Sequence, residues 1–365
     1  MPAVCAILVN YFSAPLVARA VQSVLAQGGG LPGALDVRVV DNSADAAEAA
    51  RLRQMLPPQA TLTVNESNEG FARACNRAFA GSRAPFVLLL NPDALLLPGA
   101  LASLTEILVR DAQAGAAGPR TYWDEGRAFL MPPSTFPSTA SRLGDLMARH
   151  WPWADRWRSR LFRARAWRAW HTDQPVTVPA LSGGHVLLKR AALEAAGGLF
   201  DERFFLYWED SDLMQRLRAA GYRLWLVPQA QAVHAYTHSP EKGRLIGAGW
   251  PAYFEKHFAP GWLPWSTLER VLAPAPGAAP WPTLHEAPRD NGDLVLPVPS
   301  EWQGGWLLEI SPSRDFVPAI GHLGRGPVAR VPAALHGRLT GAVYHLRLTP
   351  DTRWPRHSLG WQFQN

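Results

Sequence analysis

Apolar runs alternate with helix-like stretches through about the first 110 residues, and this alternation restricts the fold more than any other feature. Buried strands are predicted at residues 3–9, 37–40, 61–64 and 86–90. Helices are predicted at residues 15–27, 45–55, 70–80 and 101–109. A repeated strand and helix folds into a parallel sheet with helices on both faces. We therefore expect an α/β domain.

The remainder of the chain is less regular. Periodicity breaks down from about residue 122 to residue 175. Further strands are predicted at 177–181, 185–189, 222–227 and 232–236, with a helix at 210–220. Four prolines in residues 273–282 indicate a semi-rigid linker, and short alternating segments at 294–298, 306–310 and 343–348 indicate strands. We expect an α/β domain over 1–272, a linker over 273–283 and a small all-β module over 284–365.

The composition is typical of a folded globular protein. The chain has 365 residues, of which 47% are hydrophobic and 18% charged, enough for one large domain and a small one. Cys5 and Cys75 fall in predicted buried elements and the start of the chain lacks a signal-peptide pattern, so we expect a reduced, cytoplasmic protein. No run approaches the ~18 apolar residues of a membrane-spanning helix.

Residues 149–168 form a basic segment rich in aromatic side chains. It holds seven arginines and one acid, Asp155, interleaved with Trp151, Trp153, Trp157, Phe162 and Trp167. A solvated face, a nucleic-acid surface and a surface for anionic lipid or a lipid diphosphate all fit this composition. No nucleic-acid motif accompanies it, so we expect no nucleic-acid partner and a peripheral membrane contact through residues 149–170. The arginines expected to face lipid are Arg156, Arg158, Arg160, Arg163 and Arg165.

Polar residues follow the predicted strands. Asp41, with Asn42 and Ser43, follows the second strand, where a carboxylate can accept from a base N–H or a ribose hydroxyl, although these are also ordinary turn residues. Residues 68–76 open a helix whose N-terminal amides suit a phosphate or sugar, or simply form an N-cap. Asp93 follows the strand at 86–90 and is either a hard oxygen ligand for Mg²⁺ or Mn²⁺ or part of a turn.

Three acids, Glu209, Asp210 and Asp212, lie in one predicted first helical turn, directly after an apolar run. Acids at this position stabilise the helix dipole. An apolar and acidic junction is also a setting in which a carboxylate becomes a general base. His234 follows the last strand of the domain and would be structural, unless a nearby carboxylate marks a metal site.

The order and spacing of these motifs over residues 3–240 resemble family 2 glycosyltransferases of the GT-A type, which have a Rossmann-like nucleotide-diphospho-sugar transferase fold. The runs 68–76 and 182–210 resemble most the rhamnosyl- and galactofuranosyltransferase-like branch. The resemblance implies that Asp210 is the catalytic base, with Glu209 as the competing candidate, and that Asp93 and His234 bind the metal. It also implies donor contacts from Asn10, Asp41, Asn42, Ser43, Asn68, Gly70, Phe71, Asn76 and Asn91, and acceptor contacts from Gly183, Gly184, Trp208 and Asp212.

One departure from the family pattern concerns the metal. The usual motif has two acids, whereas this chain has Asn91 and Asp93, which predicts a weaker metal site or one more dependent on His234. The resemblance implies an inverting, Mg²⁺- or Mn²⁺-dependent hexosyltransferase that uses a dTDP- or UDP-sugar, with a rhamnose-like sugar. The acceptor would be a glycan or a lipid-linked saccharide for cell-surface polysaccharide, at the cytoplasmic face of the plasma membrane.

Two other functions compete with this one. A nucleotidyltransferase on a similar sheet would need a Gly-rich basic loop after the first strand, where the chain has Asn10-Tyr11-Phe12-Ser13. A non-catalytic carbohydrate-binding protein could use Trp302 and Trp306 but would have no need of Asp210.

Overall fold

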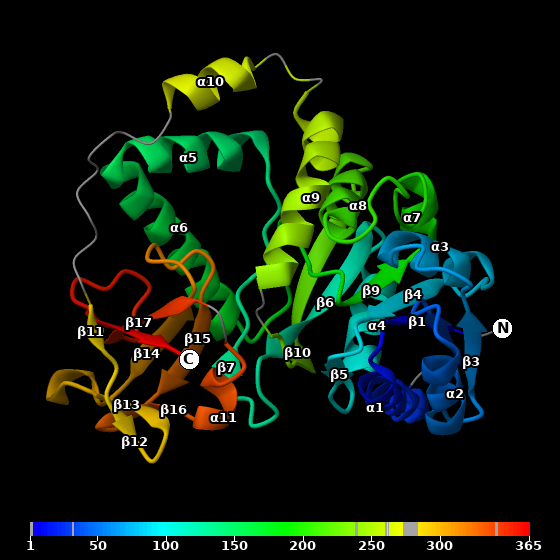
Figure 1. Cartoon of the computed structure of the whole chain (residues 1–365), viewed down its shortest axis with the longest axis horizontal. Helices are drawn as coiled ribbons and strands as arrows, with labels where there is room; N and C mark the ends of the chain where they lie inside the picture. The colour runs from blue at the N-terminus through cyan, green and yellow to red at the C-terminus, as the bar shows by residue number, and fades with distance from the viewer. Residues whose placement is uncertain are drawn as a thin grey trace.

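The computed structural model describes residues 3–30, 33–237, 240–259, 261, 263–272, 284–339 and 342–365. Its N-terminal part is a layered α/β domain (Figure 1). Four strands pair in parallel in the order β3-β2-β1-β4: β1 (Val4–Asn10), β2 (Leu35–Asp41), β3 (Ala60–Val64) and β4 (Phe86–Leu90). The connecting helices are α1 (Ala14–Leu25), α2 (Ala46–Met55), α3 (Phe71–Ala80) and α4 (Ala100–Arg110). The predicted α/β architecture is confirmed.

The sheet continues beyond β4 as a mixed sheet. β9 (His185–Lys189) lies antiparallel between β4 and β6 (Ala114–Tyr122), and β10 (Arg223–His234) runs parallel to β6. Two short strands, β5 (Ala94–Leu96) and β8 (Val176–Thr177), pair antiparallel with β10. Helices α1, α2 and α4 cover one face of the sheet, and α3, α7 (Arg190–Ala195) and α8 (Glu209–Ala219) cover the other. The C-terminal ends of β1, β2 and β4 therefore lie at one edge, where α/β proteins bind ligands.

The C-terminal region is rich in strands but shares its sheet with the first domain. Its strands are β11 (His285–Glu286), β12 (Arg289–Asp290), β13 (Asp293–Pro297), β14 (Trp306–Ser311), β15 (Ile320–Gly324), β16 (Val328–Val331), β17 (Val343–Pro350) and β18 (Leu359–Gln364). β15 pairs with β7 (Phe129–Leu130), which pairs with β6. β12, β13 and β16 form a second small sheet beside the short helix α11 (Ala333–His336). The predicted linker at 273–283 lies outside the described residues, and the domain boundaries stay a prediction.

Two helices occupy the segment in which no regular structure was predicted. α5 (Thr139–His150) and α6 (Pro152–His171) form a hairpin that turns at Trp151. The sequence pattern did not reveal α6 because its buried side chains, among them Ala154, Phe162 and Trp170, do not form one apolar stripe. α9 (Pro240–His257) and α10 (Trp265–Val271) follow β10. Among the helices within the described ranges, none combines the length and the apolar content needed to cross a membrane.

Candidate active site

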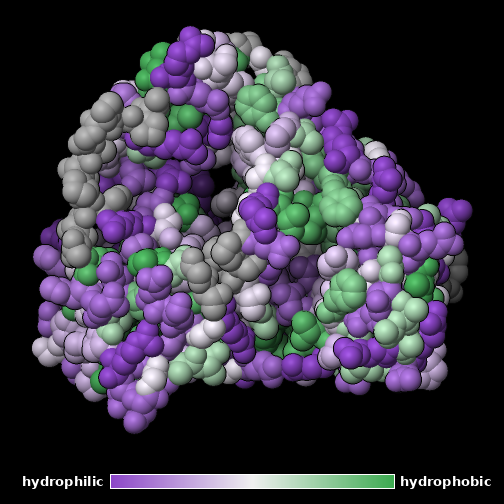
Figure 2. All heavy atoms as spheres, viewed as in Figure 1, coloured by the Kyte–Doolittle hydropathy of each residue, from purple (hydrophilic) through white to green (hydrophobic). Residues whose placement is uncertain are grey.

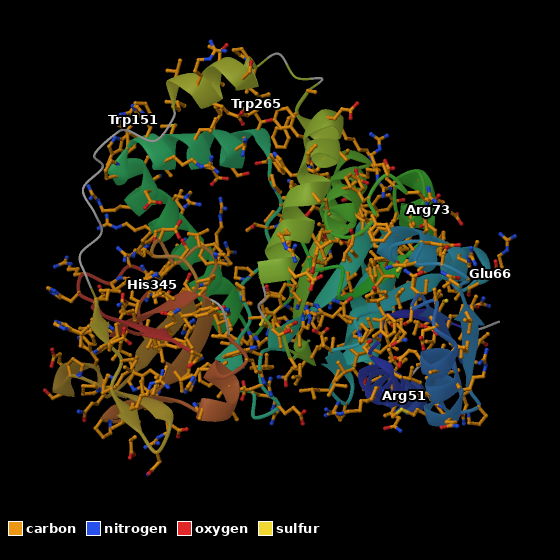
Figure 3. All side chains as sticks on the ribbon, viewed as in Figure 1. Arg51, Glu66, Arg73, Trp151, Trp265 and His345 are labelled. Carbon is orange, nitrogen blue, oxygen red and sulfur yellow. The ribbon has the colours of Figure 1, made fainter. Side chains whose placement is uncertain are left out.

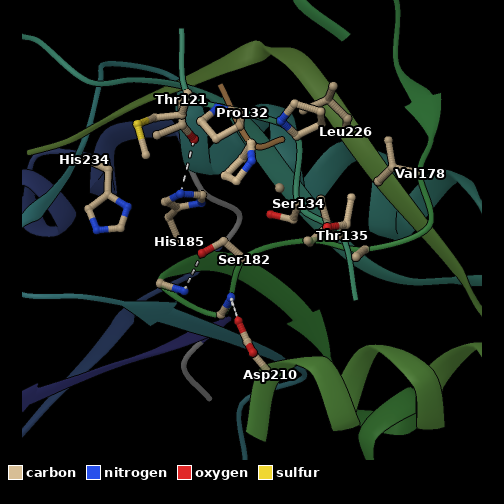
Figure 4. A pocket seen from close by; sticks show the side chains of 18 of the residues that line it. Thr121, Pro132, Ser134, Thr135, Val178, Ser182, His185, Asp210, Leu226 and His234 are labelled. Carbon is tan, nitrogen blue, oxygen red and sulfur yellow. Dashed lines mark hydrogen bonds between the residues drawn. The ribbon is translucent and has the colours of Figure 1, made fainter. Parts of the chain in front are cut away.

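A cavity of about 630 Å³ lies at the strand ends, between the α/β domain and α6. The sheet and the loops after it contribute Asn91, Asp93, Gly183, Gly184, His185, His234 and Tyr236. The first turn of α8 contributes Glu209 and Asp210, α6 contributes Arg165, Arg168 and Trp170, and α9 contributes Lys242. Figure 2 shows the surface hollowed at the centre of this face, and Figure 4 shows the cavity from close by.

Asp93 and His234 lie side by side in this cavity, as the sequence predicted. His234 Nε2 is 3.2 Å from Asp93 Oδ1, and the two side chains are 11% and 26% exposed. Burial alone would raise the pKa of Asp93, but the hydrogen bond and charge of His234, with Lys242, lower it below its ordinary value. Within the described residues, no group of three or more His, Cys, Asp or Glu side chains is placed to hold a metal. A carboxylate oxygen and an imidazole nitrogen still form a donor pair that suits Mg²⁺ or Mn²⁺ when other ligands complete the shell.

Asp210 lies at the N-terminus of α8, and backbone groups hold its carboxylate. Oδ2 accepts from the Gly183 N–H at 3.2 Å, and Oδ1 accepts from the Ser211 N–H at 2.6 Å. A Cβ at Gly183 would come within 2.7 Å of Asp210 Cβ, so this approach requires glycine. Burial raises the pKa of Asp210, and the hydrogen bonds from Gly183 and Ser211 oppose that rise. Figure 4 shows Asp210 below Ser182, with His185 and His234 on the opposite side of the cavity.

Glu209 is the more deeply buried of the two acids. Its side chain is 5% exposed, and Oε2 has no hydrogen-bond partner among the described residues. Burial, with the adjacent charge of Asp210, raises the pKa of Glu209 to about 8. The preceding residues, Tyr207 and Trp208, both have left-handed backbones, with φ of 67° and 73°. Two such residues in a row store strain where α8 begins, and strain of this kind is concentrated at functional sites.

A buried polar network joins the ends of β1 and β2. Asn10 Nδ2 lies 3.0 Å from Asp41 Oδ1 and 3.2 Å from both Ser43 Oγ and Glu48 Oε1. Asn10 Oδ1 accepts from the N–H and hydroxyl of Ser13. Asn10 and Asp41 are fully buried, and Asp41 Oδ2 has no partner among the described residues. Asn10 is therefore saturated by protein contacts, which argues against a direct contact with the donor, and Asp41, fully buried, does not line the cavity.

Asn42 and the start of α3 form a second layer of this network. Asn42 Nδ2 donates to Asn68 Oδ1 at 2.7 Å and to the Gly70 carbonyl at 3.2 Å. Gly70 has φ of 84°, and a Cβ there would lie 2.5 Å from the Phe205 carbonyl oxygen. Glycine is therefore required here because the protein's own backbone approaches it closely, and not because a ligand does. The Phe71 N–H also donates to that carbonyl, at 2.7 Å. The Asn42 and Asn68 side chains and the Phe71 N–H, which were predicted to contact the donor, are therefore bonded within the protein. Phe71 does line the cavity.

Two other predicted contacts are also internal. Asn76 bonds with both ends of its amide to the Phe200 backbone, at 2.9 and 3.0 Å, and does not line the cavity. The Trp208 indole N–H donates to the Ile246 carbonyl at 2.7 Å, and its ring packs on Tyr253. These contacts argue against a donor role for Asn76 and an acceptor role for Trp208.

Asp212 is the clearest correction. It is fully buried and lies within 2.8 Å of Lys256, His257 and Arg216. Burial alone would raise the pKa of Asp212, but hydrogen bonds from His257, Lys256 and Arg216 lower it to about 2. Asp212 therefore anchors α8 against α9 and does not meet an acceptor. The acidic residues looked equivalent in sequence because helical position alone does not show what packs against each one.

Sequence reasoning missed several residues of the cavity. His185 lies edge-on to His234 with ring centroids 5.3 Å apart, and burial, then the charge of His234, lowers the pKa of His185 to about 3. His185 is therefore a neutral neighbour of the metal-ligand candidates. Arg165 and Arg168 reach the cavity from α6, and only the prediction of that helix could have placed them. Gly184 and Asn91, by contrast, were both predicted as site residues; both line the cavity, and the Asn91 N–H donates to the Gly184 carbonyl at 2.8 Å.

A mixed α/β sheet with acidic groups gathered in a cavity at its strand ends is the architecture of GT-A glycosyltransferases. The model of the family described as glycosyl transferase family 2 matches residues 5–193, just over half of the chain. The chain belongs to glycosyl transferase family 2. It is therefore a glycosyltransferase, and the nucleotidyltransferase and binding-protein alternatives are set aside. Glu209, Asp210 and His234 lie beyond the matched range.

Two kinds of known protein resemble this chain. The N-acetylglucosaminyl-diphospho-decaprenol L-rhamnosyltransferases of Mycobacterium tuberculosis strains CDC 1551 / Oshkosh and ATCC 25618 / H37Rv are each 31% identical to it over 221 residues, covering 56% of this chain and 68% of the relative. Among solved structures, the mannosyltransferase PcManGT from Pyrobaculum calidifontis, in complex with GDP-Man and Mn²⁺, has a TM-score of 0.47 at 20% identity, over 74% of this chain and 68% of that one. GalNAc-T7 with UDP, GalNAc and Mn²⁺ has a TM-score of 0.44 at 13% identity, over 74% and 54%.

Proposed function

We propose that this enzyme transfers a rhamnose-like sugar, with inversion at the anomeric carbon, from a dTDP- or UDP-sugar to a lipid-linked saccharide. The observation that carries the proposal is that Asp210 and the Asp93–His234 pair open into the same cavity. An inverting transfer needs a base on the acceptor side and a cationic group at the leaving diphosphate, and one site with both kinds of residue suits that reaction.

Asp210 is the proposed base. Its carboxylate is oriented by Gly183 and Ser211, and these N–H donors stabilise the ionised form that can accept a proton. Glu209, whose pKa is raised to about 8 by burial and by the charge of Asp210, is protonated near neutral pH and cannot accept one. Asp210 would take the acceptor proton as the hydroxyl oxygen bonds to the anomeric carbon and the nucleotide diphosphate departs.

Asp93 and His234 are the proposed metal ligands, with Mg²⁺ or Mn²⁺ as the ion. One or two carboxylates from the protein, with the rest of the shell left to phosphate and water, is how Mg²⁺ is usually held in nucleotide enzymes, and His234 would add a nitrogen donor to the Asp93 carboxylate. A bound divalent ion would neutralise the charge that develops on the leaving diphosphate. At the neighbouring strand ends, the unpartnered Asp41 Oδ2 would accept from the base or ribose of the donor.

The acceptor is proposed to be a saccharide diphosphate on a polyprenyl lipid. Two observations support this class: the cavity is lined by Arg120, Arg165 and Arg168, and the relatives at 31% identity are named as acting on N-acetylglucosaminyl-diphospho-decaprenol. Guanidinium groups are well suited to phosphate oxygens. The product would enter cell-wall polysaccharide, with the enzyme working at the cytoplasmic face of the plasma membrane.

The increase in thermal stability caused by a bound nucleotide, measured with and without metal, tests the donor class and the metal together. With UDP or dTDP at about 100 times its dissociation constant, we expect about 2.7 kcal/mol of stabilisation in Mn²⁺ or Mg²⁺ and much less in EDTA. Asp93→Ala should remove the metal-dependent part, while Glu66→Ala, an exposed acid near β3, should keep it. Equal stabilisation in EDTA would contradict the metal assignment, and no response to either nucleotide would contradict the donor class.

Transfer is then measured with a polyprenyl-diphosphate N-acetylglucosamine acceptor and a set of labelled dTDP- and UDP-sugars. NMR of the product should show the anomeric configuration opposite to that of the donor. Retention of configuration would contradict inversion, and hydrolysis of the donor without transfer to the lipid fraction would contradict the acceptor class.

A further inference from the structure

The arginines of α6 fall into two sets that differ in their contacts. Arg158 and Arg163 face the body of the protein: Arg158 pairs with Asp145, Asp155 and Asp315, and Arg163, only 3% exposed, bonds to Glu309 of β14. Arg163 is too buried to reach a membrane, and the side chain of Arg158, 31% exposed, is paired with three carboxylates, so these contacts argue against two of the five arginines predicted to face lipid. These pairs attach α6 to the C-terminal strands and so fix which face of the helix points outward.

The second set is Arg156, Arg160, Arg165 and Arg168, which are all exposed. The four-residue spacing of Arg156 and Arg160 places these two on one side of the helix, whereas Arg165 and Arg168 lie further along α6 and further round it, where they line the cavity. In the described part of the chain, none of them forms a salt bridge. Exposed apolar side chains lie between them on the same side: Trp153, Trp157 and Leu161 are 55%, 56% and 37% exposed. We call this side, from Trp153 to Leu161, the Trp–Arg face.

The hairpin corner extends the Trp–Arg face. Trp151 both ends α5 and begins α6, and Pro152 occupies the first helical position, so the two helices meet without a connecting loop. The Trp151 ring, 37% exposed, stacks on Trp153 with centroids 6.2 Å apart. Figure 3 shows Trp151 at this corner, at the periphery of the molecule. A hollow of about 320 Å³ on the face is lined by Trp153, Arg156, Trp157 and Arg160.

We propose that the Trp–Arg face docks on an anionic lipid bilayer. Exposed tryptophans are unfavourable in water but are stabilised at the bilayer interface, where the ring is buried and the N–H stays hydrated. Unpaired arginines between them are complementary to the phosphates of anionic lipids. The hollow, with two guanidinium groups and two indole rings around it, has the chemistry to receive one lipid head group. Both requirements of an interfacial site, aromatic insertion and positive charge, therefore occur on one exposed helix face.

Docking in this way would direct the cavity toward the membrane. Arg165 and Arg168 follow the Trp–Arg face along α6, turned further round the helix, and line the cavity, and α6 rises by about 18 Å from Arg156 to Arg168. A lipid-linked diphosphate could thus pass from the docked end of α6 to the active site; this step rests on the proposed function. The docking itself does not, because it requires neither donor nor acceptor.

Vesicle co-sedimentation of the full chain, without substrates, tests the docking. We compare phosphatidylcholine vesicles with vesicles that also contain phosphatidylglycerol, at low and high salt. Binding should require the anionic lipid and fall steeply with salt. Arg156→Gln/Arg160→Gln should lower the partition coefficient about 25-fold at low salt, since each arginine near the surface contributes about fivefold. Trp153→Ala/Trp157→Ala should lower it by about tenfold or more and leave the salt dependence unchanged.

The matched control is Arg53→Gln/Arg110→Gln, which removes two exposed arginines at the ends of α2 and α4. It has the same net charge as the α6 double variant and should bind vesicles like the native protein. An equal loss in the control, or a native protein that fails to sediment with anionic vesicles at low salt, would overturn the proposal. So would binding of nucleic acid in place of vesicles, or a dimer in sedimentation analysis that the tryptophan variant converts to monomer. All variants change exposed side chains, and their melting temperatures show whether they are folded.

Discussion

The strand-end network around Asn10 and the acidic turn at Glu209 are both buried clusters of carboxylates, but they treat those carboxylates in opposite ways. In the network, Asn10 lies 3.0 Å from Asp41 and 3.2 Å from Glu48, and Glu48 also accepts from the Ala14 N–H at 2.9 Å. Each cluster leaves one carboxylate oxygen without a partner among the described residues, Asp41 Oδ2 and Glu209 Oε2, but only in the acidic turn do two consecutive residues with left-handed backbones precede the carboxylate.

The comparison indicates that one cluster fixes the geometry of the site and that the other exchanges protons. A saturated network holds its groups in one geometry, so the strand ends can present a fixed acceptor such as Asp41 Oδ2. Burial, with the charge of Asp210, raises the pKa of Glu209 to about 8, so Glu209 keeps a proton that an ordinary carboxyl group would have lost, beside Asp210, whose carboxylate accepts from the Gly183 and Ser211 N–H groups. We infer that the network is chiefly rigid donor support and that the acidic turn performs the proton chemistry. Three variants test this division.

The largest effect is expected for Asp210→Asn. The acceptor hydroxyl is a poor nucleophile until its proton is removed, and a general base typically contributes ~10²–10⁴-fold. Turnover should therefore fall by at least ~100-fold, while the dissociation constant of the donor changes little. The amide oxygen can still accept from the Gly183 N–H, so the protein should stay folded. Steady-state kinetics and nucleotide titration measure the two quantities, and near-normal turnover would remove Asp210 from the role of base.

Most of the first domain could be predicted because its signals are local. The strand β4 and the helix α3 can each be recognised from a short stretch of chain, and the polar residues after the strands indicate the edge where the site lies. The family resemblance then supplied roles that the residues alone left open. The positions agree with those roles, because Asp93 lies beside His234 and Asp210 lines the same cavity. The roles themselves stay predictions.

The remaining errors concern contacts between distant segments. α6 could not be recognised because Arg163 is buried against Glu309, 146 residues further along the chain. Asp212 was grouped with Glu209 and Asp210 because the sequence does not show that Lys256 and His257 pack on it. The predicted strand-rich C-terminal region is present, but the sequence did not show that β7, a strand of two residues, pairs with β15 and joins that region to the main sheet. In each case a tertiary partner decided the outcome.

An intermediate effect is expected for Asn10→Ala, which tests the saturated network. The variant removes the Asn10 donor from Asp41 Oδ1 and from Glu48 Oε1, which keep the Ser43 and Ala14 N–H groups, and a hydrogen bond to a charged group contributes about 1.5–3 kcal/mol. The free energy of unfolding from urea denaturation should fall by that amount. Gln54→Ala, which removes an exposed amide from α2, is the control and should change little. If Asn10→Ala is as stable as the control, the network is not the rigid support that the comparison assumes.

The smallest change in turnover is expected for Glu209→Gln. Burial and the charge of Asp210 raise the pKa of Glu209 to about 8, so at pH 7 the native side chain is already neutral, and glutamine has similar size and no charge. Turnover at pH 7 should therefore stay within about tenfold of the native value, well short of the loss for Asp210→Asn. A dead Glu209→Gln enzyme beside an active Asp210→Asn enzyme would reverse the two assignments.

The same variant has a distinct signature in stability. In the unfolded chain Glu209 loses its proton near its ordinary pKa of 4.5, whereas in the folded protein it keeps the proton to about pH 8. Between these values the folded state binds more protons than the unfolded state, so the free energy of unfolding of the native protein falls as pH rises. Glutamine does not titrate and removes this slope. The melting temperature of Glu209→Gln should therefore rise relative to the native protein from pH 5 to pH 8, and a constant difference would show that Glu209 is not held protonated by its burial.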